Sequence, residues 1–141
     1  MKKLIILLTV LSTSFISCRK VETSSIVETE KLALENATVV MAGNFSFSSE
    51  RSTGSAKVYR QTNGKYVLGL EQMNLNVSST LTVYLSSSKT AYASSIETFS
   101  VINLSGDLFH ILRDNIDFAT FKYLIIQNEH SEEIVASAIL K

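Results

Sequence analysis

The chain has 141 residues, enough for one ordinary domain, because domains most often contain roughly 100 to 150 residues. Hydrophobic residues make up 45% and charged residues 18%, a composition that is typical of a globular protein and excludes a disordered one. The formal net charge is zero, so we expect no nucleic-acid partner, because nucleic-acid binding needs a clustered basic face.

The first seventeen residues have the pattern of an export signal. Lys2 and Lys3 precede an apolar stretch from Leu4 to Leu11, which Ser12, Thr13 and Ser14 interrupt before Phe15 and Ile16. This stretch is too short for a permanent span, since a transmembrane helix needs about 20 apolar residues. We therefore expect residues 1–17 to be a signal peptide that is removed.

The next motif, Phe15-Ile16-Ser17-Cys18, resembles the lipobox of bacterial lipoproteins, in which a signal peptidase cleaves before a lipid-modified cysteine. Phe15 stands where leucine is commonest. Cys18 is the only cysteine of the chain, and a folded body without thiols suits an oxidising exported compartment. We expect Cys18 to anchor the protein to a membrane of the bacterial cell envelope, with the outer membrane as the expected location. The alternative is ordinary secretion with Cys18 as a spare thiol.

Residues 18–36 are expected to form the lipidated N-terminus and a polar tether rich in Ser, Thr and Glu. From Thr38 onward the hydrophobic period becomes two, and strand-forming residues are enriched. Residues 37–141 are therefore predicted to be one β-rich domain.

The first predicted strand covers residues 38–47, where Phe45 and Phe47 alternate with polar neighbours. Asn63-Gly64 predicts a type I′ turn between the second and third strands, because both central residues of that turn need positive φ. The remaining predicted strands are 55–61, 65–71, 81–85, 98–104, 108–112, 121–127 and 134–140. Closely spaced short strands are typical of a sandwich or a barrel, and we predict an all-β, antiparallel β-sandwich of about seven or eight short strands.

Several short motifs, in their order along the chain, resemble the DM-thirteen domain family. They are Gly43-Asn44-Phe45, Ser52-Thr53-Gly54-Ser55-Ala56, Leu68-Gly69-Leu70, Leu81-Thr82-Val83-Tyr84-Leu85-Ser86 and Ala138-Ile139-Leu140. The resemblance covers residues 43–141. It implies a small β-sandwich in a secreted or membrane-anchored protein, and a role in electron transfer.

The chain departs from that family at the suspected redox position. The penultimate strand of the family usually ends in an aromatic residue followed by a cysteine, and these positions fall here on Gln127 and Asn128. Neither side chain carries electrons or binds a soft metal as a thiolate does. The resemblance therefore supports the fold and argues against the redox activity.

Other candidate sites consist of scattered polar residues. If Phe109 and Ile111 face the core, His110 points outward by alternation. A predicted turn carries potential metal ligands, and three aspartates are possible acid or base groups, although nothing places two of the aspartates around one cleft. The turn residues are Glu129, His130, Glu132 and Glu133, and the aspartates are Asp107, Asp114 and Asp117. Tyr59, Tyr66 and Tyr84 are candidates for an exposed aromatic strip.

These observations favour a lipoprotein whose domain binds a partner or acts as a scaffold, with no enzymatic activity, no cofactor and no metal. Its expected partners are the membrane, reached through the lipid anchor, and an envelope protein or a small molecule. A redox accessory domain is the main alternative, and a hydrolase is a weaker one.

Overall fold

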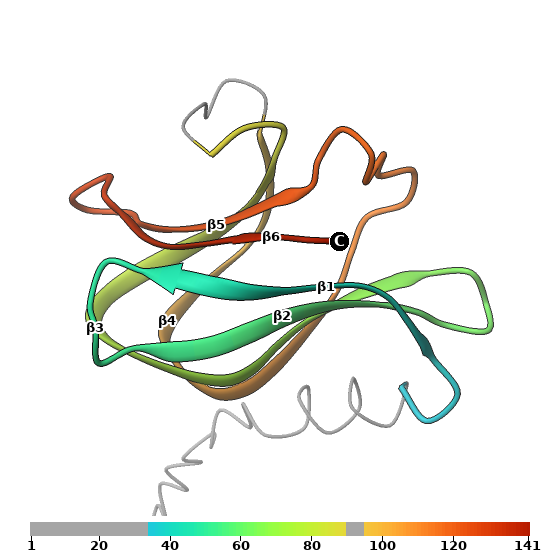
Figure 1. Ribbon diagram of the computed structural model, residues 1–141, viewed down its shortest axis with the longest axis horizontal. Helices are drawn as coiled ribbons and strands as arrows, with labels where there is room; N and C mark the ends of the chain where they lie inside the picture. The colour runs from blue at the N-terminus through green and yellow to red at the C-terminus, as the bar shows by residue number, and fades with distance from the viewer. Residues whose placement is uncertain (1–33, 90–94) are drawn as a thin grey trace, which may run out of the picture.

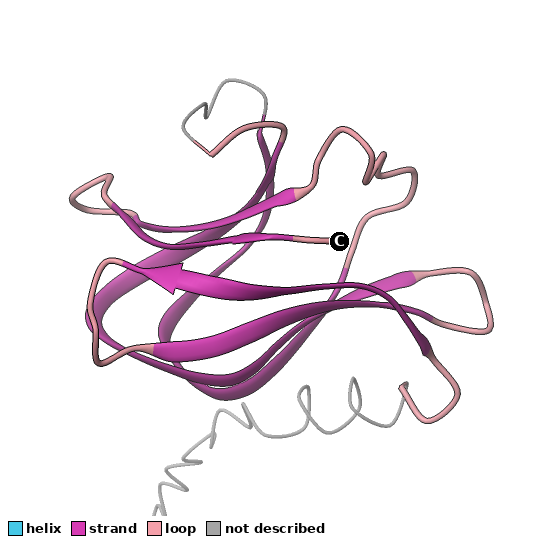
Figure 2. Ribbon diagram, in the orientation of Figure 1, coloured by secondary structure: helices cyan, strands magenta, loops and turns pink. Residues whose placement is uncertain are grey.

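The computed structural model describes residues 34–89 and 95–141 (Figure 1). The predicted signal peptide, Cys18 and the tether up to residue 33 lie outside these ranges. The two ranges contain strands, turns and loops (Figure 2). Within them, no helix has the length and apolar character that a membrane span requires. The strands are β1 (Thr38–Phe47), β2 (Thr53–Arg60), β3 (Tyr66–Ser86), β4 (Ser95–Ile111), β5 (Tyr123–Asn128) and β6 (Ile134–Ile139).

All six strands belong to one antiparallel sheet, in the order β2-β1-β6-β5-β3-β4. A further pairing between β2 and β3 closes β2, β1, β6, β5 and β3 into a circuit. The sheet is therefore a barrel. The prediction of an all-β, antiparallel fold is confirmed, whereas the prediction of a sandwich is wrong because the strands do not divide into two separate sheets.

The circuit closes because β3 takes part at two places. Its first half pairs with β2 and its second half, from Leu81 to Ser86, pairs with β5. β4 pairs with β3 along both halves, and the two strands curve together from the layer of β1 and β2 to that of β5 and β6 (Figure 1).

Four predicted short strands are in fact two long ones. Apart from their end residues Lys65 and Leu112, the predicted strands 65–71 and 81–85 lie in β3, and 98–104 and 108–112 lie in β4. Bulges explain the difference, since the register between the two strands shifts from Leu70 to Met73 and again from Leu75 to Thr80. An extra residue in a strand interrupts the period of two while the strand continues.

The predicted hairpin between β2 and β3 is present, but its turn is not type I′. The backbone N–H of Gly64 donates to the carbonyl of Gln61 at 2.9 Å, and the N–H of Gln61 donates to the carbonyl of Lys65 at 2.9 Å. Only Gly64 has positive φ in this turn, at 85°. This is the pattern of a three-residue loop, a type I turn followed by a left-handed glycine.

The barrel interior is filled with aliphatic side chains, mainly from β3, β5 and β6. In β5, Leu124, Ile125 and Ile126 are all fully buried, which confirms that this strand is apolar on both faces. In β1, Phe45 and Phe47 are half-buried while their neighbours are exposed, as the alternation predicted. The largest fully buried side chains include Val58, Leu68, Leu70, Leu81, Val83, Leu85, Leu104 and Leu140.

The pairing between β1 and β6 is the shortest in the circuit. It joins Phe45–Phe47 to Ala136–Ala138. Two backbone hydrogen bonds extend it, from the N–H of Ala42 to the carbonyl of Lys141 at 2.9 Å and in the reverse sense at 3.0 Å. The last residue of the chain therefore contributes to barrel closure.

Candidate ligand-binding site

A pocket of about 240 Å³ lies in the bend of β4, against the loop that follows this strand. Ile96 and Thr98 line it from the first half of β4, and His110 lines it from the second half. Leu112 and Arg113 follow directly in the chain. Because β4 curves with β3, residues that lie far apart along one strand converge on this pocket.

His110 faces the interior side of the sheet at this pocket. It lies directly opposite Leu68, which is fully buried in the core. The imidazole is half-buried and packs on the ring of Phe99, with 4.6 Å between the ring centroids and an angle of 37° between the planes. Burial lowers the pKa of His110 below its ordinary value of 6.5, because a charged imidazole is poorly solvated there.

Phe109 determines this orientation by packing on the outer face. It lies opposite Gly69, and its ring meets that of Tyr59 at 6.2 Å in an edge-on arrangement. Phe109 is nonetheless only 6% exposed. His110 was expected to point outward if Phe109 faced the core. Phe109 packs on the outer face instead, and alternation places His110 on the opposite, inner side.

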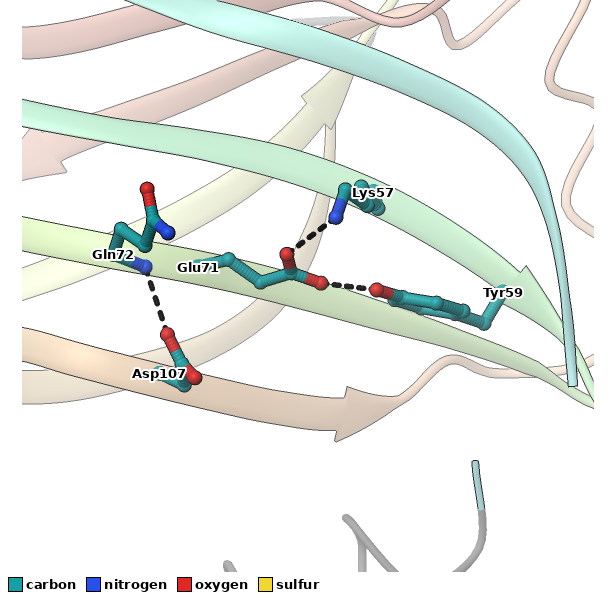
Figure 3. A network of polar contacts seen from close by, with 5 residues as sticks. All are labelled: Lys57, Tyr59, Glu71, Gln72 and Asp107. Carbon is teal, nitrogen blue, oxygen red and sulfur yellow. Dashed lines mark hydrogen bonds and ion pairs between the residues drawn. The ribbon is translucent and has the colours of Figure 1, made fainter. Parts of the chain in front are cut away.

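A polar network crosses β2 and β3 on that outer face (Figure 3). The Lys57 Nζ donates to one carboxylate oxygen of Glu71 at 2.6 Å, and the Tyr59 hydroxyl donates to the other. Burial, followed by the hydrogen bond to Glu71, raises the pKa of Tyr59 to about 12. The hydrogen bond to Glu71 also raises the pKa of Lys57.

This network is suited to joining two strands rather than to proton transfer. A tyrosine with a pKa of about 12 stays protonated at neutral pH, and Glu71 has a donor on each oxygen. A general acid or base works best with a pKa near the operating pH. We therefore assign Lys57, Tyr59 and Glu71 a structural role.

Gln127 and Asn128, which the resemblance to the DM-thirteen family places at its redox position, hold the turn between β5 and β6. Asn128 Oδ1 accepts hydrogen bonds from the backbone N–H groups of His130 at 2.9 Å and Ser131 at 3.2 Å. Gln127 Nε2 donates to the carbonyl of Glu132 at 2.7 Å. Both side chains are therefore used to fix the conformation of this turn.

The same turn carries the acidic residues and the histidine that the sequence suggested as metal ligands. Glu129, His130, Glu132 and Glu133 are all exposed. Within residues 34–89 and 95–141, no group of three or more His, Cys, Asp or Glu side chains is placed to hold a metal ion.

The three candidate aspartates have separate surroundings. Asp107 accepts a hydrogen bond from the backbone N–H of Gln72 at 2.8 Å, at a bulge of β3 (Figure 3). Asp117 accepts from the Thr120 hydroxyl at 2.7 Å and the Ala119 N–H at 3.0 Å. These two bonds, that of Thr120 first, lower the pKa of Asp117. Asp114 is exposed in the loop after β4.

The three candidate tyrosines do not form one strip. Tyr59 lies on the outer face, whereas Tyr66 packs against the core and against the ring of Phe118, with 5.0 Å between centroids. Tyr84 lies opposite Ile125, near the other end of β3. Alternation places Tyr66 on the same face as the fully buried Leu68 and Leu70, whereas Tyr59 pairs with Val67 on the other face.

A second hollow, of about 390 Å³, lies over β1 and β6. It is lined mainly by polar groups, among them Asn44, Ser46, Ser137 and the two lysines Lys89 and Lys141. Ligand pockets combine an apolar lining with a few convergent polar groups. The pocket at His110 matches that description better, and sequence reasoning missed it because it depends on the bend of β4.

Comparisons with family models, with curated proteins and with solved structures gave no match. The fold and the site together define an antiparallel β-barrel with a small, mostly aliphatic pocket. The resemblance to the DM-thirteen family stays a prediction that rests on the order of short motifs.

Proposed function

We propose that this protein is a lipid-anchored lipoprotein of the bacterial cell envelope whose barrel domain binds a ligand or partner and has no catalytic role. The observation that carries the proposal is the position of Cys18, the only cysteine, directly after Phe15-Ile16-Ser17 and shortly after the apolar stretch from Leu4 to Leu11. Each buried methylene of an acyl chain adds about 0.8 kcal/mol of membrane affinity, so two or three chains anchor a protein stably.

The distance between the anchor and the barrel supports this arrangement. β1 begins at Thr38, and residues 19–37 connect it to Cys18. A segment of this length reaches at most about 70 Å when fully extended. The tether would therefore keep the domain close to the membrane while leaving its surface open to partners in the envelope.

A binding role is favoured over a catalytic one by the hydrogen bonds of the candidate groups. Asp107 and Asp117 accept hydrogen bonds at a bulge and in a turn, and Glu71 is shared by Lys57 and Tyr59. The pocket at His110 is the place where a small ligand would enter. The alternative redox role would need a bound cofactor or metal. Gln127 and Asn128 do not provide a thiolate that could bind one.

The anchor is tested by changing Cys18 to Ala in the full chain expressed in a bacterial host. We expect Cys18→Ala to move the protein from the membrane fraction to the soluble envelope fraction, because no sulfur is left to acylate. Ser25→Ala, a change in the tether beyond the lipobox, is the control and should remain with the membrane.

Mass spectrometry of the membrane-associated protein should show an N-terminal Cys18 carrying acyl chains. Retention of Cys18→Ala in the membrane, or an unmodified N-terminal methionine, would contradict the proposal. A stoichiometric metal or chromophore in the purified protein would favour the redox alternative instead.

A further inference from the structure

The pocket in the bend of β4 has an apolar floor. Ile96, Leu112 and Ile116 line it, and each is less than 10% exposed. Its volume of about 240 Å³ lies below the 300 to 1,000 Å³ of most ligand pockets, so it suits a molecule smaller than a typical drug. These properties favour a ligand with a compact hydrocarbon body.

Arg113 gives the mouth of this pocket a positive charge. It lines the pocket and is exposed. The one ion pair found among residues 34–89 and 95–141 joins Lys57 and Glu71, so no described carboxylate forms an ion pair with Arg113. A guanidinium presents several N–H donors in a fixed plane, which matches the two oxygens of a carboxylate.

His110 adds a second polar group without a described partner. Its pKa is lowered by burial alone, and no hydrogen bond from a described residue contributes to that shift. Stacking on Phe99 restricts the orientation of the ring. The ring nitrogens of His110 are not among the buried side-chain atoms of the described residues that lack a partner, so they are open to solvent and available to a bound polar group.

We propose that the pocket between Ile96, His110 and Arg113 binds a small organic carboxylate, with its hydrocarbon body on the aliphatic floor and its carboxylate between Arg113 and His110. This inference rests on the proposed binding function and names its ligand class. Inorganic phosphate would leave the aliphatic floor uncovered, and a neutral apolar molecule would leave Arg113 and His110 without partners.

The test is an NMR titration of the full chain in detergent micelles, with benzoate as the probe and benzamide as its uncharged analogue. We expect benzoate to shift the amide resonances of Leu112 and Arg113 in a saturable way. Benzamide should bind at least about tenfold more weakly, because a charge-assisted hydrogen bond is lost and 1.4 kcal/mol corresponds to a factor of ten.

Arg113→Gln removes the charge at an exposed position and should leave the fold intact. It should raise the dissociation constant for benzoate about tenfold or more while leaving that for benzamide nearly unchanged. Arg51→Gln is the matched control, because Arg51 is also exposed but lines a different hollow, and it should bind benzoate as the unchanged chain does.

Equal affinity for benzoate and benzamide would overturn the carboxylate class. Shifts that map away from the pocket, no saturable shift, or an unchanged affinity in Arg113→Gln would overturn the site. These outcomes are independent of the anchor, since membrane attachment through Cys18 is measured by fractionation. Loss of benzoate binding with intact attachment would therefore contradict this inference alone.

Discussion

His110 is half-buried at the mouth of the pocket. It faces the core side of the sheet opposite Leu68, and it has a ring contact with Phe99 but no hydrogen bond to a residue that the structure describes. A change at His110 should therefore affect both the free energy of unfolding and ligand binding, and both can be measured.

His110 makes the stability of the barrel depend on pH. Its pKa is lower in the folded protein than in the unfolded chain, because burial disfavours the charged imidazole. As the pH falls through the unfolded value of about 6.5, the unfolded chain takes up a proton that the folded protein binds less readily, so the free energy of unfolding decreases. Urea denaturation between pH 7.5 and pH 5 should show this loss, and His110→Gln should show less of it.

His130 provides the control for that experiment. It is exposed in the turn between β5 and β6, so His130→Gln removes a histidine without changing the environment of His110. This variant should keep the pH dependence of the unchanged protein. Identical slopes for all three proteins would mean that His110 does not contribute.

At the scale of the strands, local patterns in the sequence predicted some elements correctly. The alternation around Phe45 and Phe47 gave β1, and the run Leu124 to Ile126 marked β5 as buried on both faces. The hairpin at Asn63-Gly64 was also predicted, although with the wrong turn type. In these cases the residues that decide the structure are neighbours in the chain.

The long strands β3 and β4 could not be predicted in this way. Gln72 and Asn103 have positive φ, at 51° and 63°, and lie at irregular positions of the two strands. The backbone N–H of Gln72 is satisfied by Asp107, which is 35 residues away in the sequence. Such bulges depend on contacts with a distant strand, so the local sequence pattern predicts loops at these positions. For the same reason it does not predict the bend of β4 or the pocket beside it.

The network on β2 and β3 should contribute modestly to the pairing of these strands. Glu71→Gln removes the ion pair with Lys57 but keeps an oxygen that accepts from Tyr59. Because the Lys57 and Glu71 side chains are 36% and 17% exposed, we expect a loss of under about 1 kcal/mol in the free energy of unfolding. Urea denaturation measures the loss, which should shrink in high salt because salt screens partly exposed charges.

The pKa of Tyr59 provides a second measurement on the same variant. Spectrophotometric titration of tyrosine ionisation should show one group near pH 12 in the unchanged protein. In Glu71→Gln this pKa should fall, since the negative charge that disfavours the phenolate is gone, although burial still raises it. Glu133→Gln, at an exposed turn position, should change neither the stability nor this titration. An unchanged Tyr59 titration in Glu71→Gln would contradict the network.

For the whole molecule, closure of the barrel depends on the short pairing of β1 with β6. Gly43 lies there, and a Cβ atom at this position would come within 2.3 Å of the Ile139 carbonyl oxygen and 2.9 Å of its carbonyl carbon. Both are backbone atoms of β6, so a rotamer change cannot relieve the clash. The absence of a side chain at Gly43 is therefore what allows the two strands to approach.

Gly43→Ala should open the seam between β1 and β6 and destabilise the barrel. Overpacking typically costs 1–3 kcal/mol, and we expect a loss in that range in urea denaturation. Amide hydrogen exchange should accelerate most at Ala42 and Lys141, whose N–H groups donate across the seam. Asn44→Ala, on the exposed face of β1, should change the stability by less than about 0.5 kcal/mol. If exchange at Ala42 and Lys141 stays at its original rate in Gly43→Ala, the seam tolerates a side chain and the barrel does not depend on this glycine for closure.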